Sequence, residues 1–223
     1  MWSENVASRG GQEIGSCLLY HLRHRIPHTT KRVILYSDSC GGQNRNIKVS
    51  LLLKHFMENS GIESIEQKFF VSVNSCDRAF GLIEKERKLH ETIASPYDWI
   101  EVVSQSRKKE PKFILTVMQK EHFVSSRNLE RFITNRKVDE NKNKISWLNT
   151  RSLLYTRNDP FRISMTNNHK ITQILNIAKR KTITRNDFTS TELPRLFPKG
   201  KAITKSKFID LQCLQMFLPK AIL

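Results

Sequence analysis

The sequence has no apolar run near the ~18 to 20 residues that a helix needs to cross a bilayer. Its N-terminus also lacks the charged segment and the apolar segment of a secretory signal peptide. We therefore predict a soluble, intracellular protein, nuclear or cytoplasmic and not secreted, with no membrane partner.

Cysteine is scarce, and the four residues Cys17, Cys40, Cys76 and Cys213 never form a C-x-x-C pair. This spacing supports neither a zinc knuckle nor a disulfide framework, so free thiols are expected. The chain also lacks a glycine-rich phosphate loop and a nucleophile elbow. The sequence thus gives no sign of a P-loop nucleotidase or a serine hydrolase.

Acidic residues are few in the second half of the chain. The 223 residues include 38 Lys and Arg against 21 Asp and Glu, a net charge of +17. Residues 1–100 hold 13 basic and 11 acidic side chains, whereas residues 101–223 hold 25 and 10. Such charge favours a polyanion, because phosphate contacts release counterions and dominate nucleic-acid affinity. The alternative is a merely basic, soluble surface. We expect a core within 1–100 that a basic part, 101–223, completes or extends.

The most informative stretch is RVILYSDSCGGQNRN, from Arg32 to Asn46. Val33 to Tyr36 is a continuous apolar run, which predicts a buried central strand. The run Lys68 to Val73 predicts a second strand, parallel to the first because a helix separates them. Asp38 then stands at the carboxyl edge of the sheet, where active sites of open α/β folds gather.

Two further carboxylates follow the second predicted strand. Asp77 and Glu84 are seven residues apart, so on a helix they project to nearly one side. Two-metal enzymes that act on nucleic acids need several carboxylates to hold their ions. We therefore predict Asp38, Asp77 and Glu84 as catalytic residues, with Asp38 and Asp77 sharing Mg²⁺ or Mn²⁺. The alternative is that Asp38 closes a turn, Asp77 caps a helix and Glu84 is a solvated charge.

Amide and basic side chains suit phosphate groups. Gln43 and Asn44 could also orient a metal-bound water. A basic arm near residue 180 shows little apolar periodicity. The predicted partner is nucleic acid, with DNA as the first candidate, and the predicted contacts are Gln43, Asn44, Arg45, Lys179, Arg180, Lys181 and Arg185.

The remaining pattern predicts a series of shorter elements. A polar loop and turn residues separate several of them. We expect a helix from Ile14 towards Pro27, a helix after Gly42, a short helix at Pro96–Val103, a strand at Phe113–Met118, a helix at Ser125–Thr134, a small β element between Ile145 and Met165, and a helix at Phe208–Leu218.

Four segments resemble a domain of unknown function that occurs in transposon-associated animal proteins and looks like a ribonuclease-H-like transposase or integrase core. They are Trp2 to Leu18, Tyr36 to Asn46, Cys76 to Lys85 and, more weakly, Lys205 to Pro219. The resemblance implies an α/β fold with a ribonuclease-H-like mixed sheet flanked by helices. An irregular, basic α+β part would follow it.

The chain departs from that family in two ways. It lacks the Gly-His-Ser segment before the Cys-Asp-Arg motif, and it begins too late to hold the family's first strands. We therefore predict a transposase-derived nucleic-acid-binding protein that is catalytically incomplete alone. Any activity would be that of a divalent-metal-dependent nuclease or strand transferase. The alternatives are a domesticated, non-enzymatic DNA-binding or scaffold protein and a metal-dependent phosphoesterase.

Overall fold

The computed structural model describes residues 1–70, 75–93, 95–179 and 184–214. The chain divides into two compact units, each assembled from segments that are far apart in sequence. One unit comprises Met1–Ser8, Val73–Lys120 and Lys199–Leu223, and we call it the helical unit. The other comprises Arg9–Ser72 and Glu121–Pro198, and we call it the sheet unit because it contains the described strands.

The sheet unit confirms the predicted mixed α/β architecture. Its five-stranded sheet has the order β1-β2-β3-β4-β5. The first two strands are parallel, as predicted, because a helix connects them, and the remaining neighbours are antiparallel. The elements are α1 (Gly11–His24), β1 (Arg32–Ser37), α2 (Ile47–Glu58), β2 (Ser64–Phe69), α5 (Arg127–Glu130), β3 (Thr150–Thr156), β4 (Arg162–Asn167), β5 (Thr172–Asn176) and α6 (Arg185–Thr189), with 3-10 turns at Lys120–His122 and Trp147–Asn149.

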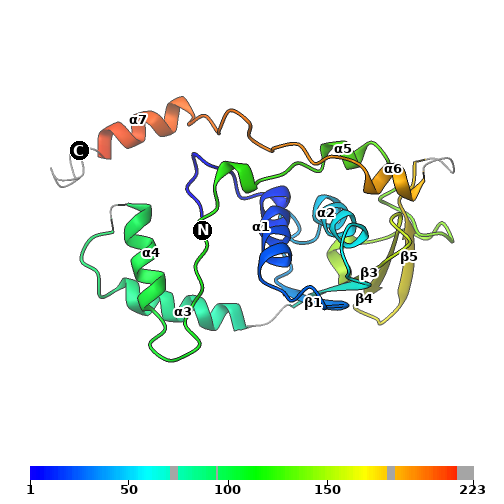
Figure 1. The fold of residues 1–223 in the computed structure, drawn as a ribbon, viewed down its shortest axis with the longest axis horizontal. Coiled ribbons are helices and arrows are strands. Elements are labelled where there is room, and N and C mark those ends of the chain that lie inside the picture. Colours follow the sequence, from blue (N-terminus) through cyan, green and yellow to red (C-terminus); the bar gives the residue numbers. More distant parts are fainter. Residues whose placement is uncertain (71–74, 94, 180–183, 215–223) are drawn as a thin grey trace. The chain divides into compact units, whose positions relative to one another are not determined.

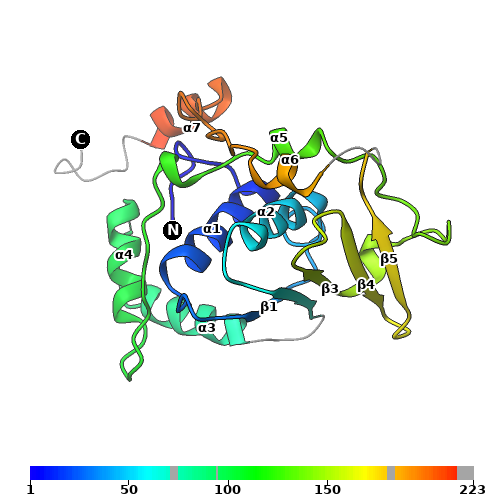
Figure 2. The same ribbon diagram turned by 45° about the vertical axis from the view of Figure 1, so that its right-hand side comes forward.

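Helices α1 and α2 pack on one face of this sheet (Figures 1 and 2). The two helices approach closely because Gly15 of α1 has no Cβ, which would lie 2.6 Å from Cδ1 of Leu52. Helix α2 is buried around most of its circumference, as expected for an apolar helix between other elements. Each fully buried leucine contributes about 1.5–3 kcal/mol to stability.

The prediction of a buried, central β1 is wrong, because β1 lies at an edge of the sheet. Val33 and Leu35 are half-buried against the core, whereas Ile34 and Tyr36 are 40% and 55% exposed. The apolar run Val33 to Tyr36 therefore belongs to a strand that buries only one of its two faces. The sheet extends from β2 in the other direction, through three antiparallel strands that the run around Val33 could not reveal.

Other predicted elements have mixed outcomes. The helices α1, α2 and α4 (Pro96–Gln105) are confirmed, as is the small β element, which contains β3 and β4. Helix α5 covers four residues of the ten predicted at Ser125–Thr134. The helix predicted at Phe208–Leu218 is present as far as Leu214, and residues 215–218 lie outside the described range. The strand predicted at Lys68–Val73 starts earlier, at Ser64, and residues 71–73 lie outside the described range. The strand predicted at Phe113–Met118 is wrong, because this segment bonds to Met1 at two backbone positions instead of joining a sheet.

The helical unit contains α3 (Ser75–Arg87), α4 (Pro96–Gln105) and α7 (Lys205–Leu214). Ser95 and Asp98 form a capping box that starts α4, with Pro96 at a position that tolerates the missing N–H. The carboxylate of Glu86 is buried on α3 and pairs with Lys108 at 3.1 Å. Among the described helices of the chain, none is long and apolar enough to span a membrane.

Candidate nucleic-acid interface

Asp38 closes the loop that follows β1. Its Oδ1 accepts hydrogen bonds from the backbone N–H of Cys40 at 3.1 Å and from the side-chain amide of Asn44 at 2.5 Å. The carbonyl of Cys40 then accepts from Asn44 and Arg45 at 2.8 and 3.1 Å. The exposed carboxylate thus performs the turn-forming role that was the alternative to catalysis.

Arg45 holds the same loop from beneath. Its side chain is buried, donates to the carbonyl of Leu148 and to Oγ of Ser39 at 2.7 Å, and lies 4.9 Å from the ring centre of Phe69. Burial lowers the pKa of Arg45, and the nearby charge of Arg151 lowers it further. This guanidinium therefore clamps the loop to β2 and to the segment before β3, and its contact with nucleic acid stays a prediction.

A buried chain of hydrogen bonds supports the loop from the core. Ser50 Oγ lies 2.9 Å from the Tyr155 hydroxyl, which donates to Oε1 of Gln67 at 3.2 Å. Gln67 in turn donates through Nε2 to the carbonyl of Asn44 at 3.2 Å. Burial raises the pKa of Tyr155, so its hydroxyl stays a donor. Because each of these side chains has a partner, the series of hydrogen bonds holds the loop against α2, β2 and β3.

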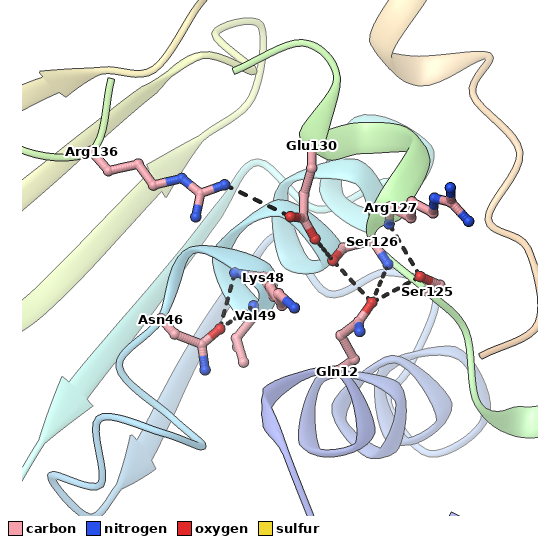
Figure 3. Close-up of polar contacts among 9 residues, drawn as sticks. All are labelled: Gln12, Asn46, Lys48, Val49, Ser125, Ser126, Arg127, Glu130 and Arg136. Carbon is pink, nitrogen blue, oxygen red and sulfur yellow. Dashed lines mark hydrogen bonds and ion pairs between the residues drawn. The ribbon is translucent and has the colours of Figure 1, made fainter. Parts of the chain in front are cut away.

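Asn46 ends the loop and begins α2. Its Oδ1 accepts from two backbone N–H groups of the first turn at 3.0 and 3.1 Å, which is a helix cap (Figure 3). Its Nδ2 donates to the carbonyl of Gln43 at 3.0 Å. The side-chain amide of Gln43 in turn donates to the backbone carbonyl of Arg9 at 3.1 Å. A Cβ at Gly11 would stand 2.2 Å from Nδ2 of Asn46. Gly11, the first residue of α1, therefore makes room for the loop.

Gln12 anchors the segment that leads into the basic half of the chain. Its Oε1 accepts from the Ser125 hydroxyl at 2.9 Å and from the backbone N–H of Ser126 at 2.8 Å (Figure 3). The Ser126 hydroxyl donates to Glu130 at 2.7 Å, and Glu130 pairs with Arg136 at 3.7 Å. The basic segment is thereby attached to α1.

Most described Lys and Arg side chains between Glu121 and Pro198 are exposed and make no ion pair with a described residue. Between Glu121 and Pro198, the described structure gives carboxylate partners to Arg136, Arg162 and Arg185. Eight other described cations there are exposed and make no ion pair with a described residue: Arg127, Arg131, Lys137, Lys142, Lys144, Lys170, Lys179 and Arg195.

One of these eight cations, Lys144, lines a polar pocket of about 460 Å³. Lys144 and His169 line it together with the amide side chains of Asn149, Asn168 and Gln173. Amides can pair with the edges of nucleobases, and lysine can pair with phosphate. No sequence pattern predicted the pocket, because its lining residues come from the segment before β3, from β3, β4 and β5, and from the turn between β4 and β5.

The predicted basic arm is only partly described. Lys179 is exposed, while Arg180 and Lys181 lie outside the described residues. Arg185 donates from Nε to Glu58 at 2.6 Å, and the Glu58 side chain is fully buried. Arg185 thus joins α6 to α2, so its charge is already partnered inside the sheet unit.

The other predicted acids belong to the helical unit. Glu84 pairs with Arg87 at 3.1 Å on the exposed surface of α3, and Asp77 stands in the first turn of that helix. Within the described ranges, no group of three or more His, Cys, Asp or Glu side chains could hold a metal ion. The described residues of each unit therefore do not by themselves fit a two-metal site, and the ion shared by Asp38 and Asp77 stays a prediction.

Neither a protein-family model, nor a curated protein, nor a solved structure matches this chain. The residues that sequence reasoning missed are the buried supports, above all Gln67 and Tyr155. Gln67 lies between the buried Ile65 and Phe69 in the alternation of β2, and Tyr155 follows Leu153 in that of β3, so the two-residue strand period was the available signal for the buried face.

Proposed function

We propose that this chain is a transposase-derived nucleic-acid-binding protein, with the sheet unit as a ribonuclease-H-like core. The sheet combines a parallel pair with antiparallel neighbours and is flanked by helices, which is compatible with that core. The resemblance of Tyr36 to Asn46 to the transposon-associated domain supports the same proposal.

The observation that carries the proposal is the set of exposed cations without carboxylate partners between Glu121 and Pro198. The sheet unit as a whole has 24 Lys and Arg against 12 Asp and Glu. Partnered cations would be neutralised locally, whereas unpartnered ones attract phosphates and release their counterions. A nucleic acid, with DNA as the first candidate, matches such a spread of charge better than a small phosphate ester does.

Catalysis by this chain alone is expected to be weak. Asp38 already bonds the loop through Oδ1, and reactive groups displaced by about 1 Å can lose ~100-fold in rate. We therefore propose weak Mg²⁺ or Mn²⁺ binding and little cleavage or strand transfer. A domesticated binding or scaffold protein is the second candidate, favoured by this turn-forming role of Asp38.

The test is the affinity of the full chain for labelled duplex DNA at several salt concentrations. We expect the logarithm of the association constant to fall linearly with the logarithm of salt, by about 0.9 for each phosphate neutralised. Salt-independent or absent binding would contradict the proposal. A nuclease assay with Mn²⁺ on wild type and Asp38→Asn distinguishes the candidates, since robust cleavage lost in the variant would show an active enzyme.

A further inference from the structure

Strand β1 has one hydrogen-bonding edge that pairs with no described strand. The carbonyls of Lys31 and Ser37 accept hydrogen bonds from the two ends of β2 at 3.2 and 3.0 Å, so these odd-numbered residues face β2. Backbone groups alternate sides along a strand, so Arg32, Ile34 and Tyr36 direct theirs away from β2, where no described strand lies. Such an edge is a template for pairing with another chain.

The edge is also apolar. Ile34 and Tyr36 are 40% and 55% exposed, on the face of the sheet opposite α1 and α2. Natural edge strands are usually protected by lysines, proline, a bulge or short length. The six residues of β1 include neither lysine nor proline, and their pairing with β2 is regular. An additional strand would bury the exposed Ile34 and Tyr36 side chains.

We propose that two copies of this chain associate through β1. The strands pair antiparallel about a two-fold axis at Leu35 and join the two sheets into one. Residues at equal distances before and after Leu35 then lie opposite each other. Ile34 lies opposite the partner's Tyr36, and Arg32 lies opposite the partner's Asp38. The symmetry repeats both pairs, because a two-fold interface uses the same surface patch on both copies.

Charge complementarity selects a second copy as the partner and fixes the register. Arg32 and Asp38 carry opposite charges, both are exposed, and each is three residues from Leu35. Within its own copy, Arg32 also pairs with Glu66 of β2 at 3.5 Å through a side chain that is 66% exposed, and Asp38 bonds its loop through Oδ1. A register centred on Ile34 instead places Arg32 opposite Tyr36 and leaves Asp38 opposite Thr30. Opposite charges across antiparallel strands stabilise pairing, and like charges oppose it. The strand is therefore complementary to itself in one register.

Sedimentation equilibrium of full-length variants tests this interface. We expect wild type to dimerise, and Arg32→Asp or Asp38→Arg alone to raise the dimer dissociation constant about tenfold, because each creates two like-charge pairs. An equimolar mixture of the two variants restores both opposite-charge pairs and should associate more tightly than either variant does alone, even though Asp38→Arg also removes the loop bonds of Oδ1. The matched control, Lys137→Asp, makes the same charge change at an exposed residue without an ion pair to a described residue, in a segment that bonds to β5 at the other end of the sheet, and should leave the dissociation constant unchanged.

Two results would overturn the interface: wild type that stays monomeric at about 100 µM, or a mixture that associates no better than its separate components. Disulfide trapping gives a second readout that changes no charge. With air oxygen as the oxidant and in a Cys40→Ser, Cys213→Ser background, an Ile34→Cys chain mixed with a Tyr36→Cys chain should form a mixed disulfide faster than either chain forms one with itself. Equal rates would contradict the register.

Discussion

The hydroxyl of Tyr155 donates a hydrogen bond to Oε1 of Gln67 at 3.2 Å, and the side chains of both residues are almost completely buried. This contact joins β3 to β2, and Gln67 extends it to the carbonyl of Asn44 in the loop. The loop geometry thus depends on a contact between residues 88 positions apart in sequence.

Tyr155→Phe should weaken this support. The substitution keeps the ring but leaves Oε1 of Gln67 buried without its donor, which costs about 1–3 kcal/mol. Urea denaturation should show a lower midpoint with an unchanged slope. Tyr97→Phe is the matched control, because Tyr97 is 80% exposed and should change stability by less than about 0.5 kcal/mol. Equal effects of the two substitutions would show that the buried hydrogen bonds of Tyr155 do not contribute to the free energy of unfolding.

Gly11→Ala tests the close approach of α1 to the loop. The added Cβ would stand 2.2 Å from Nδ2 of Asn46, so the cap of α2 must move or α1 must shift. We expect a loss of about 1–3 kcal/mol in the free energy of unfolding. Gly42→Ala is the control, since nothing lies within 4 Å of its added Cβ. A stable Gly11→Ala variant would mean that this approach is not tight in solution.

Lys54 provides a pH-dependent test. It is fully buried and donates to the carbonyls of Asp159 and Arg162 at 2.6 and 2.7 Å, and burial lowers its pKa from 10.5 to about 8. Between these values the unfolded chain binds more protons than the folded chain, so this residue makes stability rise with pH. Its contribution should be at most about 3 kcal/mol across the window.

The comparison is with Lys54→Met across pH 8 to 10.5. Other lysines, cysteines and tyrosines titrate in the same range, so the informative quantity is the difference between the two proteins. As pH rises, the free energy of unfolding of wild type should increase relative to that of Lys54→Met. A constant difference would show that Lys54 titrates normally in the folded protein.

Sequence patterns predicted the individual helices and strands better than they predicted which strands lie next to each other in the sheet. Helices α1 and α2 and the parallel pair of β1 with β2 followed from apolar spacing and from the helix between the strands. The edge position of β1 did not, because strand order depends on three antiparallel strands that come more than 110 residues after it. The sequence alone does not show whether an apolar side chain such as that of Tyr36 lies on a buried or an exposed face of the sheet.

The candidate site shows a similar limit. The sequence identified the loop around Asp38 as a concentration of polar groups, and the structure shows many of them bonding to one another. Which polar groups face inward depends on distant partners such as Gln67 and Leu148, which no local pattern reveals. Net charge, in contrast, is a property of composition and could be read directly.

The salt dependence of DNA binding by a charge-reversed variant tests the central claim most directly. Lys142, Lys144 and Lys170 are exposed cations of the sheet unit that make no ion pair with a described residue, and changing all three to Glu should weaken binding to every DNA sequence and flatten the salt slope by up to about 2 to 3. The control reverses Lys85, Lys88 and Lys109, exposed lysines of the helical unit that make no ion pair with a described residue, and its slope should match wild type. Equal slopes for wild type and the Lys142, Lys144 and Lys170 variant would contradict a nucleic-acid interface on the sheet unit.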